Sequence, residues 1–278
     1  MTDHDVTGHA ARRPWAFVDH TREQLSRRAR DGAVLVIPVG AIEQHGPHLP
    51  VWTDTLIASE VAERAVRQIG DAADLLVAPA VSFGSSQHHL PFGGTLSLRS
   101  TTLLDVLMDL GRSAVSSGFQ RIFFVNGHGG NDELVQIAAR DLALELAVHT
   151  ACISWWNLVT PIVRESSLDA AQARIPGHAG AFETVVVSAL LPHLVGAPPA
   201  EQPAPEAKQQ RSRIEMHGAW LRADGYTDAP GSLPAGDGDQ ILQIAVTALA
   251  EELSRFAAIA DRQPLHDSPT PEEATTRD

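Results

Sequence analysis

The stretch from residue 33 to residue 54 reads AVLVIPVGAIEQHGPHLPVWTD. It opens with seven apolar residues, which is typical of a strand buried on both faces of a parallel sheet. The polar part that follows contains Glu43, His45 and Asp54. Glu43 and His45 are two residues apart, so in extended chain their side chains point to the same side. Because divalent metal ions bind carboxylate oxygens and imidazole nitrogens, the stretch predicts a metal site at the end of a buried strand.

Apolar runs alternate with helical patterns along the rest of the chain, which indicates βαβ units and an α/β fold with a mostly parallel sheet. We expect a single domain over residues 21–262, preceded by a flexible segment (1–20) and followed by a disordered tail (263–278). Residues 196–205 are rich in Pro and Ala and predict a surface connection. Thr53 or Asp54 is the expected N-cap of the second helix. The expected strands are 33–39, 75–80, 121–125 and 148–154, and the expected helices are about 21–30, 54–69, 100–117, 131–147, 181–191 and 239–260.

Composition narrows the class of protein. The chain has 278 residues and a formal net charge of -13, which argues against nucleic acid as a partner because a polyanion would be repelled. No apolar run approaches the length that spans a bilayer, and the N-terminus lacks the apolar core of a signal peptide. We therefore expect a cytoplasmic protein without a membrane partner. The single cysteine, Cys152, excludes an internal disulfide.

Two further clusters carry metal-type side chains. His128 lies in the segment NGHGGN (126–131), directly after the third expected strand, and His178 and Glu183 lie at the start of an expected helix. Ligands of parallel sheets bind outside the carboxyl ends of the strands, so Glu43, His45 and His128 should reach the same edge.

Each cluster has a simpler explanation when taken alone. The NGHGGN segment could be a glycine turn that leads into a helix, and it lacks the lysine and the spacing of a nucleotide-binding loop. His178 could cap a turn, and Glu183 could favour the helix dipole. Three such clusters together favour a metal site, and the absence of an H-E-x-x-H motif and of a cysteine cluster excludes zincin and structural zinc sites.

The segments 37–55, 84–98, 124–131 and 178–184 resemble the creatininase family of metal-dependent amidohydrolases, with Glu-x-His-Gly-Pro-His-Leu-Pro as the most specific match. The resemblance implies a three-layer α/β fold with a central parallel sheet flanked by helices, and two divalent ions, zinc and/or manganese, with iron possible. It also implies a ring-shaped homo-oligomer, with a hexamer favoured. Carried over by motif, the metal ligands are Glu43, His45, Asp54, which bridges both ions, and His128, and His178 resembles the catalytic acid/base histidine.

One position departs from the family pattern. Creatininase has a metal-binding glutamate two residues after the histidine of its Asn-Gly-His motif, whereas this chain has Gly130. Glu183 is the expected substitute as a metal ligand and as part of the catalytic set. Relatives with this arrangement include deformylases of formylamino-pyrimidines and a peptidase that trims a ribosomally made redox-cofactor precursor.

Four more residues are expected near the substrate. His89 lies three residues before the Phe-Gly-Gly-Thr segment, a placement shared with family members, although it could equally be a loop histidine that is hydrogen-bonded to backbone. Gly129 follows His128. Trp155 and Trp156 follow the last strand and could form an aromatic wall, although both could equally be core or subunit-interface residues.

The resemblance predicts a hydrolase of a carbon–nitrogen bond in a small amide or cyclic amide, similar to creatinine amidohydrolase, with metal-activated water and a histidine proton shuttle. One alternative is a maturation peptidase or deformylase of a cofactor pathway, of the mycofactocin or formylamino-pyrimidine type. Another is a non-catalytic metal-binding member of the same fold.

Overall fold

A four-stranded parallel sheet forms the centre of the computed structural model, which describes residues 13–201, 221 and 224–259. Its order is β2-β1-β3-β4, and all three strand pairs are parallel, as predicted. Val39, the last residue of β1, pairs with Asn126, the last residue of β3, so the carboxyl ends of the two central strands are level. The strands are β1 (Val34–Val39), β2 (Leu75–Val77), β3 (Arg121–Asn126) and β4 (His149–Ser154).

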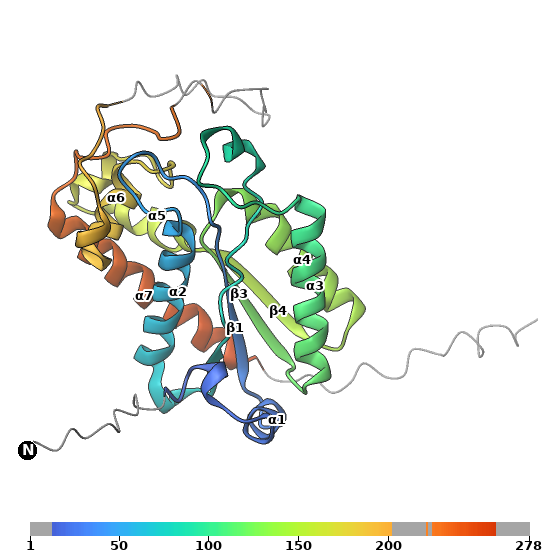
Figure 1. The fold of residues 1–278 in the computed structure, drawn as a ribbon. Helices are drawn as coiled ribbons and strands as arrows, with labels where there is room; N and C mark the ends of the chain where they lie inside the picture. Colours follow the sequence, from blue (N-terminus) through green and yellow to red (C-terminus); the bar gives the residue numbers. More distant parts are fainter. Residues whose placement is uncertain (1–12, 202–220, 222–223, 260–278) are drawn as a thin grey trace, which may run out of the picture.

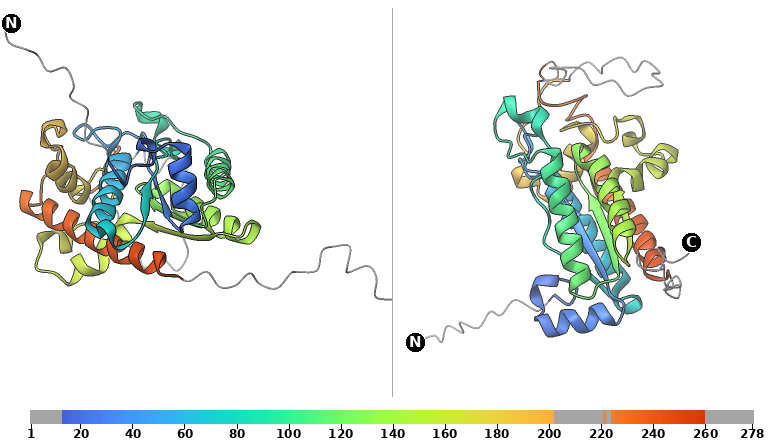
Figure 2. Two further views of the ribbon diagram at one scale, coloured as in Figure 1. Left: turned by 90° about the horizontal axis from the view of Figure 1, so that it is seen from below. Right: turned by 90° about the vertical axis from the view of Figure 1, so that its right-hand side faces the viewer.

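Helices lie on both faces of this sheet (Figures 1 and 2). The six expected helices are present, and the helix α5 was not expected from the sequence. The helices are α1 (Arg22–Arg30), α2 (Thr53–Ile69), α3 (Ser100–Ser116), α4 (Asp132–Glu145), α5 (Trp155–Glu165), α6 (Ala181–Leu190) and α7 (Ala235–Ala257).

Side-chain alternation along the strands divides the core into two layers, which gives the three-layer fold that the resemblance implied. Val34, Val36, Phe123 and Val125 pack in one cluster with α2, α5, α6 and α7. The alternate residues of β1 and β3 pack in a second cluster with α1, α3 and α4. Every residue of β1 and β3 is buried, which explains why these strands are apolar runs rather than alternating patterns.

The start of α2 differs from the prediction. Neither Thr53 nor Asp54 is the N-cap; both lie in the first turn and are buried, and Trp52 occupies the cap position without a capping side chain. The Thr53 hydroxyl donates to Pro50 O at 2.7 Å instead. The predicted cap was wrong because the Asp54 carboxylate faces imidazoles rather than the helix backbone.

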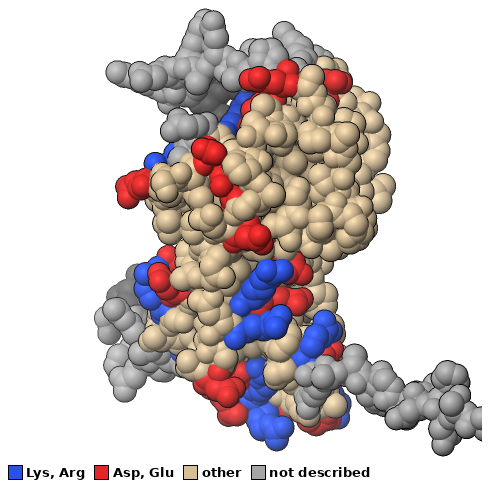
Figure 3. Space-filling view, turned by 90° about the vertical axis from the view of Figure 1, so that its left-hand side faces the viewer, with Lys and Arg blue, Asp and Glu red and all other residues tan. Residues whose placement is uncertain are grey.

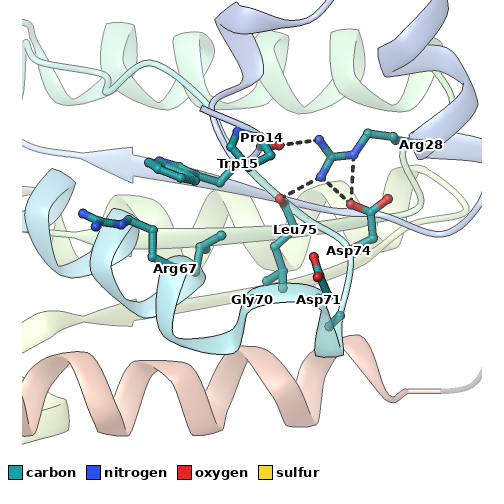
Figure 4. Close-up of a pocket in the computed structure, with 10 residues that line it drawn as sticks. Pro14, Trp15, Arg28, Arg67, Gly70, Asp71, Asp74 and Leu75 are labelled. Atoms are coloured by element: carbon teal, nitrogen blue, oxygen red, sulfur yellow. Dashed lines mark hydrogen bonds and ion pairs between the residues drawn. The ribbon is translucent and has the colours of Figure 1, made fainter. Parts of the chain in front are cut away.

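Residues 13–20 pack beside β2 and belong to the folded unit, whereas residues 1–12 and 260–278 lie outside the described part of the chain. Val77 N donates to Trp15 O, and the Arg28 guanidinium donates to Pro14 O and to Leu75 O. Arg28 also pairs with Asp74 at the edge of a cavity of about 410 Å³ (Figure 4). Arg28 therefore connects residues 13–20 to strand β2 of the sheet.

On the face shown in Figure 3, most basic side chains lie in the lower half beside acidic ones, and a broad area of the upper half shows neither. Among the residues that the structure describes, no helix combines the length and the apolar character needed to cross a membrane.

Candidate metal centre

The predicted ligands come from four separate places at the carboxyl edge of the sheet. Glu43 and His45 lie in the loop after β1, Asp54 in the first turn of α2, His128 directly after β3, and Glu183 in the first turn of α6. All five side chains are buried. The structure thus brings together residues up to 140 positions apart that the sequence assigned to one site.

Gly127 allows two of these places to meet. A Cβ atom at Gly127 would lie 2.2 Å from Asp54 O, closer than real Cβ contacts. Only glycine lets the exit of β3 approach the first turn of α2 this closely. The approach puts His128 Nδ1 at 3.0 Å from Asp54 Oδ2.

The five side chains form two groups of three that share Asp54. The first group is Glu43, Asp54 and His128, with His128 Nε2 at 3.2 Å from Glu43 Oε2. The second is His45, Asp54 and Glu183, with His45 Nε2 at 3.1 Å from Asp54 Oδ1 and 3.9 Å from Glu183 Oε2. Tetrahedral bonds of about 2.1 Å put ligand atoms roughly 3.4 Å apart, so the separations suit a zinc-sized ion in each group.

Hydrogen bonding also fits metal ligation. His45 Nδ1 lies 2.9 Å from Glu43 O, which can only accept, so His45 donates there and its Nε2 remains for a ligand bond. Both Glu43 oxygens and Asp54 Oδ2 are buried, yet they accept no hydrogen bond of normal geometry from the described residues. Buried carboxylate oxygens without donors are costly unless a cation lies against them.

The electrostatics of the cluster lead to the same conclusion. Burial raises the pKa of Glu43 and of Glu183 to about 7. Burial would lower the pKa of His45, but Asp54, Glu183 and Glu43 together raise it to about 10, and carboxylates likewise raise the pKa of His128 to about 9. The carboxylates therefore require nearby positive charge, which protons on the imidazoles supply and divalent cations can replace.

The backbone around Gly130 explains why this position carries no ligand. A Cβ atom there would lie 2.3 Å from Ser85 O and 2.5 Å from His128 Nε2, so there is no room for a glutamate side chain. Glu183 reaches the second group from α6 instead, and its Oε2 accepts from Ala179 N at 2.6 Å. This arrangement supports the prediction that Glu183 replaces the missing ligand.

His178 and His89 lie next to the cluster. The two rings stack at 4.1 Å, and His178 Nδ1 and His89 Nε2 are each 3.3 Å from Glu43 Oε1. Burial and neighbouring imidazoles lower the pKa of His89 to about 2 and hold the pKa of His178 well below its ordinary value. Both rings are therefore neutral in the metal-free protein.

The tryptophans pack as core residues. Trp155 is fully buried and stacks on Phe182 at 5.0 Å, and Trp156 is buried in the same core cluster. This is one of the two interpretations that the sequence left open, and substrate contact by either indole stays a prediction. Gly129 is exposed, and a Cβ atom there would meet nothing within 4 Å, so a ligand has room beside it.

Three polar residues support the site but were not identified from the sequence. Ser86 Oγ lies 3.1 Å from His128 Nε2, Thr227 Oγ1 accepts from His178 N at 3.0 Å, and Gln44 contacts both His89 and His178. Gln44 stands between two predicted ligands, a signal that could have been used. Thr227 is 49 residues from His178 and has no motif that indicates its role.

A parallel α/β sheet whose carboxyl edge carries two carboxylate–imidazole groups around a shared aspartate is suited to binding divalent metal ions. A family model described as Creatininase, creatinine amidohydrolase, matches residues 19–253. The chain therefore belongs to the creatininase family, whose members are metal-dependent amidohydrolases.

Known proteins resemble the chain either over part of its length at higher identity or over most of its length at lower identity. A mycofactocin precursor peptide peptidase of Mycolicibacterium smegmatis is 48% identical over 114 residues, which is 40% of this chain and 46% of that protein, so the match spans about half of the relative's length. A creatinine amidohydrolase of Pseudomonas putida is 27% identical over 248 residues, 84% of this chain and 93% of that protein. A crystal structure of creatinine amidohydrolase superimposes with a TM-score of 0.72 at 27% identity, covering 89% of this chain and all of that one.

Proposed function

We propose that this protein is a binuclear metal-dependent hydrolase that cleaves a carbon–nitrogen amide bond. The observation that carries the proposal is the sharing of Asp54 by two complete groups of three ligands. A carboxylate with one oxygen toward each group suits a pair of ions bound side by side. Two of the solved creatininases that the chain resembles are a Zn-Zn form and a Mn form, with TM-scores of 0.73 and 0.74, each 27% identical over 88% of this chain. We therefore propose zinc and/or manganese as the ions.

Each group of three residues would bind one of the two ions. Glu43, Asp54 and His128 would hold one ion, and His45, Asp54 and Glu183 would hold the other. Bound divalent ions of this kind lower the pKa of a water molecule and polarise a carbonyl. His178 presents Nδ1 beside Glu43 Oε1 and would carry a proton to the leaving nitrogen. The buried surroundings exclude bulk water, so these charges act at low dielectric.

For the substrate, we propose an amide in a peptide-derived cofactor precursor. Two features support this choice. The chain is 48% identical over 114 residues to a mycofactocin precursor peptide peptidase. It also has no space for a glutamate side chain at Gly130, the position at which the creatininase pattern has a glutamate. A small cyclic amide is the second candidate, supported by the creatinine amidohydrolase, which matches most of this chain. We also propose a homo-oligomer, with a hexamer favoured.

The test is metal analysis followed by an activity screen. Purified protein reconstituted with zinc or manganese should hold two ions per chain and hydrolyse at least one member of a panel of short peptides, formamides and lactams. Cleavage of peptides but not of creatinine would support the first substrate class, and the reverse result would support the second. Two bound ions with no hydrolysis of any member would instead indicate a non-catalytic metal-binding protein, and fewer than two ions would refute the binuclear site.

A further inference from the structure

The Gln44 side chain is buried at the point where three segments meet. It lies between the predicted ligands Glu43 and His45 in sequence, and it contacts His89, His178 and Gly225. These three residues lie in the loop after β2, at the entry to α6, and in the loop before α7. An amide in such a place can decide where hydrogens lie on its neighbours.

Backbone groups fix the orientation of this amide. Gly46 N lies 2.9 Å from Gln44 Oε1 and can only donate, whereas Gly225 O lies 2.9 Å from Gln44 Nε2 and can only accept. Exchanging the oxygen and nitrogen of the amide would place donor against donor and acceptor against acceptor. The nitrogen must therefore face the two imidazole rings.

The position of the hydrogen on the His89 ring follows from this orientation. Gln44 Nε2 has two hydrogens and cannot accept, so its 2.7 Å contact with His89 Nδ1 requires that this ring nitrogen be unprotonated. His89 then carries its hydrogen on Nε2, the atom 3.3 Å from Glu43 Oε1.

The contacts of His178 do not select one tautomer. His178 Nε2 lies 3.0 Å from both Gln44 O, which can only accept, and Gln44 Nε2, which can only donate. Its Nδ1 lies 3.3 Å from the carboxylate oxygen Glu43 Oε1, which accepts. The amide of Gln44 uses its two hydrogens on Gly225 O and His89 Nδ1, so it fixes the hydrogen of His89 alone.

We propose that Gln44 is a positioning residue whose amide holds His89 in the tautomer with its hydrogen on Nε2, so that His89 offers a hydrogen-bond donor beside Glu43 Oε1. The catalytic meaning rests on the proposed function: a donor at this point would orient the carbonyl oxygen of the amide that is cleaved. His178 keeps its separate role as the proton carrier.

The test measures the tautomers directly, without substrate. In zinc-loaded protein labelled with ¹⁵N-histidine, long-range ¹⁵N–¹H spectra distinguish protonated from bare ring nitrogens, and His89→Asn and His178→Asn variants assign the signals. His89 of the unchanged protein should carry its hydrogen on Nε2. A hydrogen on Nδ1 of His89 would overturn the proposal.

Gln44→Met tests the role of the amide because it removes the amide but keeps the backbone carbonyl and a similar volume. His89 should lose its fixed tautomer, and a His89 signal unchanged from the wild type would contradict the assignment. Two zinc ions should remain, with kcat lower by about 10–100-fold and KM changed much less. Gln243→Met on α7, where the exposed glutamine donates only to Thr247 among the described residues, is the matched control and should leave all readouts unchanged. If the wild type hydrolyses no amide, the proposed function fails while the tautomer measurement still decides this inference.

Discussion

Two adjacent glycines provide a sharp test of the site because a methyl group has opposite consequences at each. At Gly130 an added Cβ would lie 2.3 Å from Ser85 O and 2.5 Å from His128 Nε2, whereas at Gly129 it would meet nothing within 4 Å. Neither glycine has a positive φ, so alanine is compatible with both backbones. Gly130→Ala and Gly129→Ala therefore differ only in what the methyl group touches.

The size of the effect follows from the overlap. Ordinary contact begins near 3.4 Å, so Ser85 O or the new methyl group must move by about 1.1 Å. The backbone at Ser85 is held, since its N–H donates to Asn131 Oδ1 at 2.9 Å, so the backbone at residue 130 must shift away from it. The His128 ring must move as well, because its Nε2 would lie 2.5 Å from the added Cβ. Overpacking costs about 1–3 kcal/mol, and the gain of about 0.4–1 kcal/mol from a stiffer unfolded chain offsets part of it.

Two measurements are needed. Urea unfolding in EDTA should show Gly130→Ala to be less stable than the wild type by about 1.3 kcal/mol, the midpoint of the overpacking cost less the midpoint of the offsetting gain, and Gly129→Ala to be unchanged or more stable. After zinc loading, elemental analysis should find one ion lost from Gly130→Ala only, because ligand distances tolerate roughly 0.2 Å of change. If both variants behave alike, or if Gly130→Ala keeps two ions at wild-type stability, the packing around His128 is not as described.

Four further predictions concern the same site. His178→Ala should retain both ions and lose most of its turnover; normal turnover would exclude the proton-shuttle role. Glu183→Gln should lose one ion, and unchanged metal stoichiometry would remove it from the ligands. In EDTA, stability should fall as the pH rises from 7 to 9. The pKa of His45 and of His128 is raised from 6.5 to about 10 and about 9, so over this range the folded state holds their protons and the unfolded state does not. Below about pH 6.5 the raised pKa of Glu43 and Glu183 and the lowered pKa of His89 and His178 act in opposite directions, so the comparison is made above it. Equal urea midpoints at pH 7 and pH 9 would contradict the reasoning. Light scattering should give the mass of a hexamer; a monomer at micromolar concentration would be against the proposed ring.

The features that the sequence predicts well are those set by buried strands. Unbroken apolar runs at β1 and β3 arise because both faces of these strands are covered, and a polar side chain becomes possible where such a strand ends. Glu43, His45 and His128 lie at these ends, so the rule for parallel sheets was enough to bring them together. Asp54 and Glu183 required the family resemblance, because a carboxylate in the first turn of a helix is also explained by the helix dipole.

The features that the sequence does not predict depend on contacts between distant segments. Helix α5 begins directly after β4 and contains Pro161, which removes the usual signals of a boundary and of a continuous helix. Gln44 reads as a polar loop residue until the loop before α7 places Gly225 O beside it. The residues next to Gln44 in the sequence do not specify which distant backbone carbonyl will lie beside its side chain, so this contact could not be predicted.

The net charge of the proposed site depends on two positions together, Gly130 and Glu183. Asp54, Glu43 and Glu183 bring three carboxylates into one buried cluster, and two divalent cations would exceed them by a single positive charge, which one anionic oxygen of a reacting water or carbonyl can balance. If Gly130 carried a glutamate while Glu183 stayed, the excess would disappear and the site would no longer favour negative charge as it develops. In the proposed binuclear site, the lack of space at Gly130 and the carboxylate of Glu183 on α6 are thus complementary: one ligand position would be excluded and the other supplied, and three carboxylates would leave two cations able to attract an oxyanion.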